Sequence, residues 1–221
     1  MTNTQDDVQD DVQDDWTPSE GRAPASKRGH RTRNRLLEAA VRVFEERGLV
    51  DVTTQEIGRE ASLSSGTVYK YFRDKADIFR FLVTQLRQVI REETTIPVDG
   101  DGRLVVGPAV LRFLELYRDN VALYRVWWEL LDPPNEFSEV WVEVHEGYRK
   151  GFVAALKRGQ RAGVTKPGLD IELTAELAVL LFERPTYSRI VLGWDGEIED
   201  DEVAAVTDAL LGSGLGSTVT D

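Results

Sequence analysis

The stretch TTQEIGREASLSSGTVYKYF, residues 53–72, gathers hydroxyl, amide, ammonium and phenol groups in one short segment. Serine, glycine, threonine and tyrosine are not the residues that a helix uses when stability is its only requirement. Their hydroxyls and a lysine can hydrogen-bond phosphate oxygens, and aromatic edges can pack on thymine methyl groups and sugars. This composition therefore indicates a surface that contacts nucleic acid.

Two short helices joined by a tight turn can position these groups. Thr53 and Glu56 fit a capping box, in which a hydroxyl and a carboxylate satisfy free backbone N–H groups, so a helix begins here. Ser62 to Ser64 make the turn, and a second short helix is predicted over 65–72. An earlier amphipathic helix that ends at Gly48 supports both. The arrangement is a helix-turn-helix, whose second helix lies in the major groove of DNA.

The predicted DNA contacts lie on these two helices. Thr54 and Gln55, at the start of the first, can reach a phosphate. The exposed positions of the second are Ser65, Gly66, Thr67, Tyr69, Lys70 and Tyr71. An alternative remains for the two tyrosines, which could be half-buried packing residues.

The net charge of −12 conceals an asymmetry along the chain. Residues 1–26 carry one base and seven acids, a net of −6, and residues 96–221 carry twelve bases and twenty-two acids, a net of −10. The segment between them, 27–95, carries fourteen bases and ten acids, a net of +4, and includes the basic run KRGHRTRNR. A basic segment set between two acidic ones is compatible with DNA binding despite the acidic total.

Composition argues against several other classes of protein. The chain has no cysteine and two histidines, so we expect no thiolate nucleophile, no metal site and no cofactor. No apolar run approaches the length of a membrane span, and the acidic N-terminus lacks a signal-peptide pattern. We therefore expect a cytoplasmic protein that has no membrane contact and is not an enzyme.

The helical periodicity predicts an all-α protein with no strand. A disordered acidic tail over 1–26 precedes a three-helix DNA-binding domain over 27–75, and a larger helical domain over 76–212 ends in a flexible tail, 213–221. Asp74 can cap a helix over 75–94. Further helices are expected near 104–118, 120–131, 136–162, 170–192 and 199–211.

At RLLEAAVRVFEERG and VTTQEIGREASLSSGTVYKYFRDKADIF, within residues 35–79, the sequence resembles the TetR family of transcriptional regulators. The resemblance implies DNA contacts at the residues predicted above, apart from Gln55, and adds Lys75. It also implies a homodimer and a C-terminal cavity for a small-molecule inducer. In this family the last two long helices pair with those of a second subunit, and Leu177, Leu180 and Leu181 are candidates for that interface together with Ala205, Leu210 and Leu211. These residues could instead close the core of one subunit.

Aromatic side chains recur through the larger domain. Taken as a set they indicate a mostly apolar pocket with few polar anchors, although each could instead be core. The predicted lining is Phe113, Tyr117, Tyr124, Trp127, Trp128, Trp141, His145, Tyr148, Phe152 and Phe182. His145 could also be a neutral core histidine. The segments EVWVEVHEGY and LLFERPTY are similar to the ligand domain of the mycobacterial ethionamide-resistance repressor, which favours an elongated, hydrophobic ligand.

The sequence thus predicts a one-component transcriptional regulator that acts as a repressor. A small hydrophobic ligand would release the homodimer from a palindromic operator. Two alternatives stay open: a DNA-binding architectural dimer without a ligand, and an enzyme with a helical active-site cavity.

Overall fold

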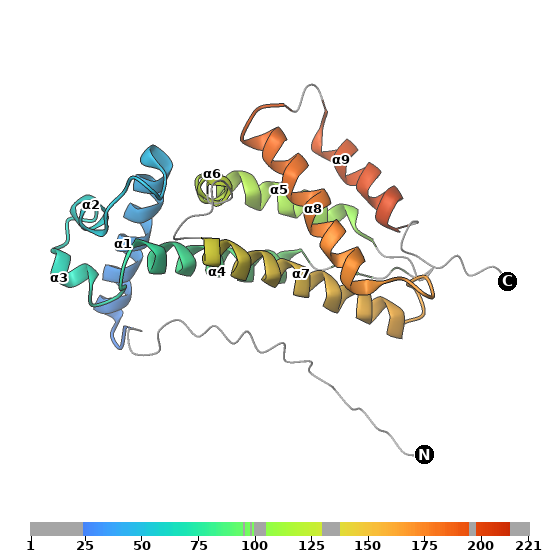
Figure 1. Cartoon of the computed structure of the whole chain (residues 1–221), viewed down its shortest axis with the longest axis horizontal. Helices are drawn as coiled ribbons and strands as arrows, with labels where there is room; N and C mark the ends of the chain where they lie inside the picture. The colour runs from blue at the N-terminus through green and yellow to red at the C-terminus, as the bar shows by residue number, and fades with distance from the viewer. Residues whose placement is uncertain are drawn as a thin grey trace, which may run out of the picture.

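The computed structural model describes residues 24–94, 96–97, 99, 105–129, 138–194 and 198–212. The two predicted tails therefore lie outside the described residues, apart from 24–26. The described part of the chain is helical and contains no strand, so the all-α prediction is confirmed (Figure 1). The helices are α1 Lys27–Arg47, α2 Thr54–Glu60, α3 Ser65–Val68, α4 Lys75–Glu93, α5 Gly107–Asp119, α6 Val121–Glu129, α7 Ser138–Arg161, α8 Ile171–Ile190 and α9 Asp200–Thr207, followed by a π-helical turn, Asp208–Gly212.

The first four helices form a head whose helix starts are fixed by local side-chain caps. Thr53 and Glu56 form the predicted capping box, with Thr53 N donating to Glu56 Oε2 at 2.8 Å. Ser64 caps α3, and Asp74 caps α4 by accepting from Asp77 N at 2.7 Å. Each cap satisfies a backbone donor that would otherwise lack an intrahelical partner. These starts therefore depend on residues adjacent in sequence.

The predicted third helix, 65–72, is wrong in its length, because α3 ends at Val68. Beyond this point Lys70 N bonds to Thr67 O and Tyr71 N to Val68 O, three residues back, so the chain tightens into turns. Tightening of this kind is common at helix ends, and here it leads into the extended Asp74 that caps α4. Tyr69 and Lys70 consequently lie just past the end of α3.

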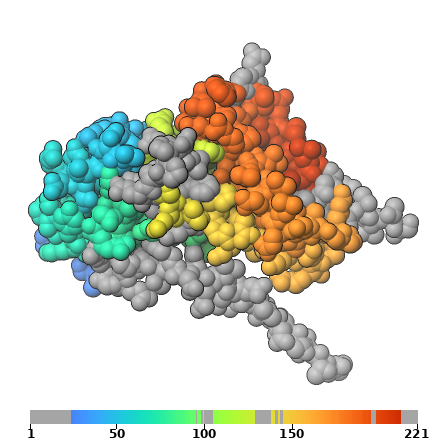
Figure 2. Space-filling view, in the orientation of Figure 1, coloured from blue at the N-terminus to red at the C-terminus, as the bar shows by residue number. Residues whose placement is uncertain are grey.

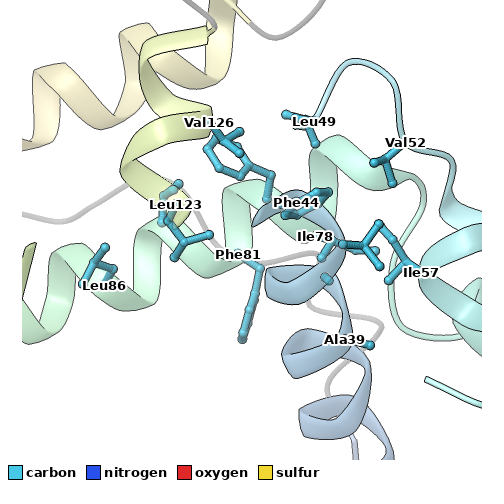
Figure 3. Packing of buried hydrophobic residues seen from close by; sticks show 14 of the residues in the cluster. Ala39, Phe44, Leu49, Val52, Ile57, Ile78, Phe81, Leu86, Leu123 and Val126 are labelled. Carbon is cyan, nitrogen blue, oxygen red and sulfur yellow. The ribbon is translucent and has the colours of Figure 1, made fainter. Parts of the chain in front are cut away.

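A continuous apolar core joins the head to the rest of the molecule. Phe44 of α1 packs edge-on against Phe79 of α4, and both are at most 1% exposed. The same cluster includes Leu123 and Val126 of α6, which packs on α1 (Figure 3). The predicted domain boundary at residue 75 falls at the start of α4, and α4 contributes to the core on both sides of it.

The remaining helices form a body beside and beyond the head (Figure 1). α7 packs on α8 and on α4, while α5 packs on α9. Asp208, after α9, accepts hydrogen bonds from Val106 N at 2.6 Å and Gly107 N at 2.9 Å, so a distant residue caps α5. α5 begins at Gly107 and not at the predicted 104, in keeping with Pro108, since proline suits the first turn of a helix. Among the described helices none is long and apolar enough to span a membrane.

Candidate functional site

One candidate site is the surface formed by α2, α3 and the turn after α3, at the end of the molecule away from α9 (Figure 2). Gly58 of α2 lets the two helices cross closely, because a Cβ there would lie 2.8 Å from Cγ2 of Val68. Ser62, between the helices, adopts a left-handed conformation with φ of 53°. The sequence thus builds a tight turn that holds α3 against α2 and leaves its outer side open.

The structure brings the nine predicted DNA contacts to this end of the head but exposes them unequally. Exposed side chains or backbone are found at Gln55, Ser65, Gly66, Tyr69 and Lys70. Tyr69 is 47% exposed, and an added Cβ at Gly66 would meet no atom within 4 Å. These positions leave room for close approach of a nucleic acid.

The other four predicted contacts, Thr54, Thr67, Tyr71 and Lys75, are only partly exposed. The Thr67 hydroxyl lies 2.9 Å from that of Ser64, and Lys75 Nζ donates to the Val50 carbonyl at 2.6 Å. Tyr71 packs against the head core, in agreement with the packing alternative that the sequence left open for it.

The basic run lies on the first turns of α1, so it is helical. Lys27, Arg28, Arg31 and Arg35 are exposed, whereas the guanidinium of Arg33 lies 5.0 Å from the ring centroid of Phe81. The exposed members add positive charge to the head, which suits long-range attraction to phosphates.

The second candidate site is a cavity of about 490 Å³ among α4, α5, α7 and α8. Its size falls in the range of about 300–1,000 Å³ that is usual for small-molecule sites. Five residues of the predicted lining border it: Phe113, Tyr124, Tyr148, Phe152 and Phe182. Phe152 stacks on Phe182 with centroids 5.8 Å apart, and Phe182 meets Phe113 edge-on at 6.3 Å. Aromatic faces therefore form one wall.

Four other predicted residues do not border the cavity, so the lining has to be revised. Tyr117 and Trp127 are at most 4% exposed within the core shared with the head. Trp128 packs beside that core and donates from Nε1 to the Tyr117 hydroxyl at 3.3 Å. His145 is buried toward α8. For Trp141 the side chain lies outside the described residues. The helical stripe that suggested these positions cannot tell which neighbour each side chain meets.

Sequence reasoning missed the polar and small residues of the lining. These are Arg87, Gln88, Arg91 and Thr94 on α4, Gly147, Lys150, Gly151 and Arg158 on α7, and Glu183 on α8. A signal was present, since Gly147, Gly151, Ala154 and Arg158 recur at i, i+4, i+7 and i+11. The small residues of this face, Gly147, Gly151 and Ala154, leave room for the Arg87 side chain and for the cavity.

A buried polar cluster lies at the inner side of this cavity. The Tyr124 and Tyr148 hydroxyls are 3.4 Å apart, and burial raises the pKa of Tyr148 to about 12, so both phenols stay neutral. His145 lies 3.3 Å from Glu176 through Nε2 and 3.6 Å from Glu183 through Nδ1. The Glu183 carboxylate raises the pKa of His145, and Glu176 adds a smaller effect in the same direction. Burial of the imidazole acts on this pKa in the opposite direction. Glu183 Oε1 is buried without a hydrogen-bond partner.

Within the described ranges no group of histidine and acidic side chains could hold a metal ion. The His145 cluster places one imidazole between two carboxylates. The chemistry of the two sites is that of binding: a polar surface that can contact DNA and a cavity that can hold a small molecule.

Comparison with known proteins relates this chain to bacterial transcriptional regulators. Residues 36–82 match the family model "Bacterial regulatory proteins, tetR family". The HTH-type transcriptional regulator YdgC of Bacillus subtilis is 27% identical over 175 residues, covering 75% of this chain and 85% of YdgC.

Two solved structures show the shared fold. A TetR-family regulator from Syntrophomonas wolfei superimposes with a TM-score of 0.72 at 18% identity, covering 86% of this chain and 99% of that one. The regulator FadR from Bacillus subtilis, in complex with stearoyl-CoA, gives a TM-score of 0.65 at 21% identity, covering 83% and 99%. With its helix-turn-helix head and helical body, the chain carries a DNA-binding domain that matches the TetR family model over residues 36–82, and it is a DNA-binding transcriptional regulator.

Proposed function

We propose that this regulator is a repressor that leaves a palindromic operator when a small hydrophobic ligand enters the body cavity. One observation carries the proposal: α4 belongs to both sites. It begins at Lys75, beside the DNA surface, and its later residues Arg87, Ile90 and Arg91 border the cavity. A ligand that moves α4 therefore acts on the position of the head.

The nine residues of the head are proposed to divide the recognition of DNA. Ser65, Gly66 and Thr67 of α3, with Tyr69 and Lys70 of the turn after it, meet phosphates and base edges in the major groove. Thr54 and Gln55 meet a neighbouring phosphate. The partly buried Tyr71 and Lys75 contribute through their exposed portions and hold the turn after α3 in place.

The proposed homodimer forms through α8 and α9, where apolar side chains are exposed in one subunit. Leu177, Leu180 and Leu181 of α8 are 56%, 48% and 50% exposed, and Leu210, after α9, is 60% exposed. Leu177 and Leu181 are one helical turn apart, so they form a stripe that a second subunit can cover. A twofold pair of heads then requires an operator with matching twofold symmetry.

The proposed ligand is hydrophobic because aromatic and aliphatic side chains form most of the cavity wall. FadR, which shares the fold, is known in complex with stearoyl-CoA, and this supports an elongated ligand here. A chain of ring contacts runs from Phe182 through Phe113 and Tyr117 to Tyr124, which stacks on Tyr117 at 3.6 Å. Tyr117 lies in the core shared with the head. Ligand contact at Phe182 can thus be transmitted to the base of the head.

The test begins with selection of a binding sequence from a random pool of double-stranded DNA. Because the proposal requires two heads, the selected sequence should be an inverted repeat. A screen of long-chain and ring-bearing apolar compounds by tryptophan fluorescence should then yield a compound that releases this DNA. By linkage, the compound must weaken DNA binding by the same factor by which DNA weakens its own binding. Absence of any releasing compound would leave an architectural dimer.

A second experiment tests whether the exposed leucines of α8 form the dimer interface. The double variant Leu177→Glu/Leu181→Glu should be a folded monomer by sedimentation and circular dichroism, whereas Val142→Glu, at an equally exposed site on α7, should remain a dimer. A dimeric double variant would place the interface elsewhere.

A regulator that binds chromosomal DNA acts in the cytoplasm, and the proposal includes that location.

A further inference from the structure

The cavity differs in charge from the rest of the body. Four of its lining residues are cations, Arg87, Arg91, Lys150 and Arg158, and one, Glu183, is an acid. The described lining residues thus have a formal net charge of +3, to which Arg87 and Arg91 of the basic segment 27–95 contribute +2 and Lys150, Arg158 and Glu183 contribute +1. Residues 96–221 as a whole have a net charge of −10, so Lys150 and Arg158 are cations within an acidic segment that share the lining with two arginines of α4.

Two helices present these cations across one groove. Arg87 and Arg91 are one turn apart on α4, Lys150 and Arg158 are two turns apart on α7, and α4 packs on α7. Between Lys150 and Arg158, α7 contributes small residues to the lining, among them Gly151 and Ala154. Arg87 lies directly over Gly147, where an added Cβ would be 1.7 Å from Nη1. The glycines leave space for the cationic side chains and for a ligand between them.

Three of these cations, Arg91, Lys150 and Arg158, are available to a ligand. Lys150 and Arg158 form no ion pair with any residue that the structure describes, and Arg91 donates to the neutral Gln88. All three are exposed. An exposed arginine or lysine near acidic helices commonly pairs with a carboxylate, as Arg112 does with Glu93 and Glu115. Lys150, Arg158 and Arg91 differ from Arg112 in this respect.

The cavity lining combines buried apolar side chains with exposed basic ones. Val110 and Val179 are each 2% exposed, and they lie with Phe113, Phe152 and Phe182 in the lining. Among the described residues of the lining the only acid is Glu183, whose side chain is 13% exposed. An anionic group would be repelled by the mostly buried Glu183 and attracted by the exposed Arg91, Lys150 and Arg158. The charges therefore set the direction in which a ligand lies.

We propose that the ligand of this cavity is a long-chain amphipathic anion, with its hydrocarbon tail among the phenylalanines and its carboxylate or phosphate on Arg91, Lys150 and Arg158. The inference rests on the proposed ligand-responsive function and names the chemical class of the ligand. It predicts that an anion binds more tightly than an uncharged compound with the same hydrocarbon chain, because only the anion gains attraction to Arg91, Lys150 and Arg158.

The experiment compares three molecules with one hydrocarbon chain: palmitate, its uncharged methyl ester and its coenzyme A thioester. Binding to the full chain is followed by tryptophan fluorescence. Palmitate or the thioester should bind at least about tenfold more tightly than the ester, and the advantage should shrink as salt is added. A stronger response to the thioester identifies a phosphate-bearing head, and a stronger response to palmitate identifies a free carboxylate.

Substitutions test whether the cations of the lining cause the tighter binding of anions. Lys150→Gln/Arg158→Gln should weaken binding of the preferred anion by about tenfold and leave binding of the ester unchanged. Lys157→Gln is the matched control, since Lys157 is exposed on the same helix but outside the lining and lies 3.7 Å from Glu172. Gly151→Leu, which projects a side chain into open space at the cavity wall, should abolish binding of all three molecules while α7 remains folded.

The outcomes separate this inference from the proposed function. Equal binding of ester and anions, or an unchanged affinity in the double glutamine variant, overturns the anionic ligand and keeps a hydrophobic inducer. If none of the three molecules binds and the wider apolar screen also fails, both proposals are overturned.

Discussion

The head and the body of this protein are both helical, but they are stabilised in different ways. In the head, α2, α3 and α4 are each capped by the residue immediately before them, and several core side chains are fully buried. In the body, α5 is capped by Asp208 from the far end of the chain, α5, α7 and α8 enclose a cavity together with α4 of the head, and leucines of α8 are half exposed. Local caps and a buried core stabilise the head within one subunit. The body, in contrast, has a cavity that a ligand can fill and exposed leucines that a second subunit can cover.

The largest expected difference is in the free energy of unfolding after truncation of an aromatic residue. Phe44→Ala in the head core should cost about 3–5 kcal/mol, because transfer energy is lost and a void remains. Phe182→Ala should cost clearly less, since Phe182 already borders open volume. Denaturant unfolding of both variants measures the comparison. Equal losses would show that the body is packed as tightly as the head.

The next effect concerns DNA affinity. Lys70→Ala should weaken binding to the selected DNA by about tenfold and reduce its salt dependence by about one released counterion, because an exposed lysine is removed from the head surface. Circular dichroism and dimerisation should not change. Lys157→Ala, which removes a lysine of the body, is the control. Parent-like affinity in the Lys70 variant would remove this residue from the proposed contacts.

A smaller effect is expected from the long-range cap. Asp208→Ala leaves the N–H groups of Val106 and Gly107 without their acceptor and should cost about 1 kcal/mol, the usual value of an N-cap. Hydrogen exchange should increase at the start of α5 and leave α2 unchanged. Asp201→Ala, an exposed acid in the first turn of α9, supplies the control. Faster exchange throughout the head would mean that the two regions unfold as one unit.

The smallest effect is a pH dependence in the body. Glu183 and Glu176 raise the pKa of His145 above its usual 6.5, so protonated His145 stabilises the folded state. This stabilisation is complete below the unfolded pKa and is lost as the pH rises through the folded pKa. Denaturation midpoints of the parent should fall over this range, and His145→Gln should remove that component. His30→Gln, which changes the other histidine, should preserve it; a parent-like profile in His145→Gln would contradict the assignment.

Much of the head could be predicted from the sequence because its determinants are local. The capping box at Thr53 and Glu56, the glycine that ends α1 and the Asp74 cap all act within a few residues. The length of α3 could not be predicted, because Val68 and Phe72 have helical spacing whether the last turn is an α-helix or a tighter turn. Hydrogen bonds three residues back decide between them.

In the body, the periodicity of a single helix does not predict the tertiary contacts of its side chains. Tyr148 and His145 lie on one predicted stripe of α7, yet Tyr148 borders the cavity and His145 lies between two glutamates of α8. The periodicity of a helix identifies its buried face but does not say which neighbouring helix covers each part of it. The cations of the lining were missed for the same reason, since Arg91 and Arg158 meet only across two helices.

The sequence by itself determined the all-α class, the helix-turn-helix and the aromatic richness of the body, because helix caps and apolar periods are encoded by residues a few positions apart. Only the tertiary structure decided which aromatics form core and which border open space, and that cations of α4 and α7 share one groove. Those properties depend on how distant helices pack, and packing is set by the combined shape of many side chains.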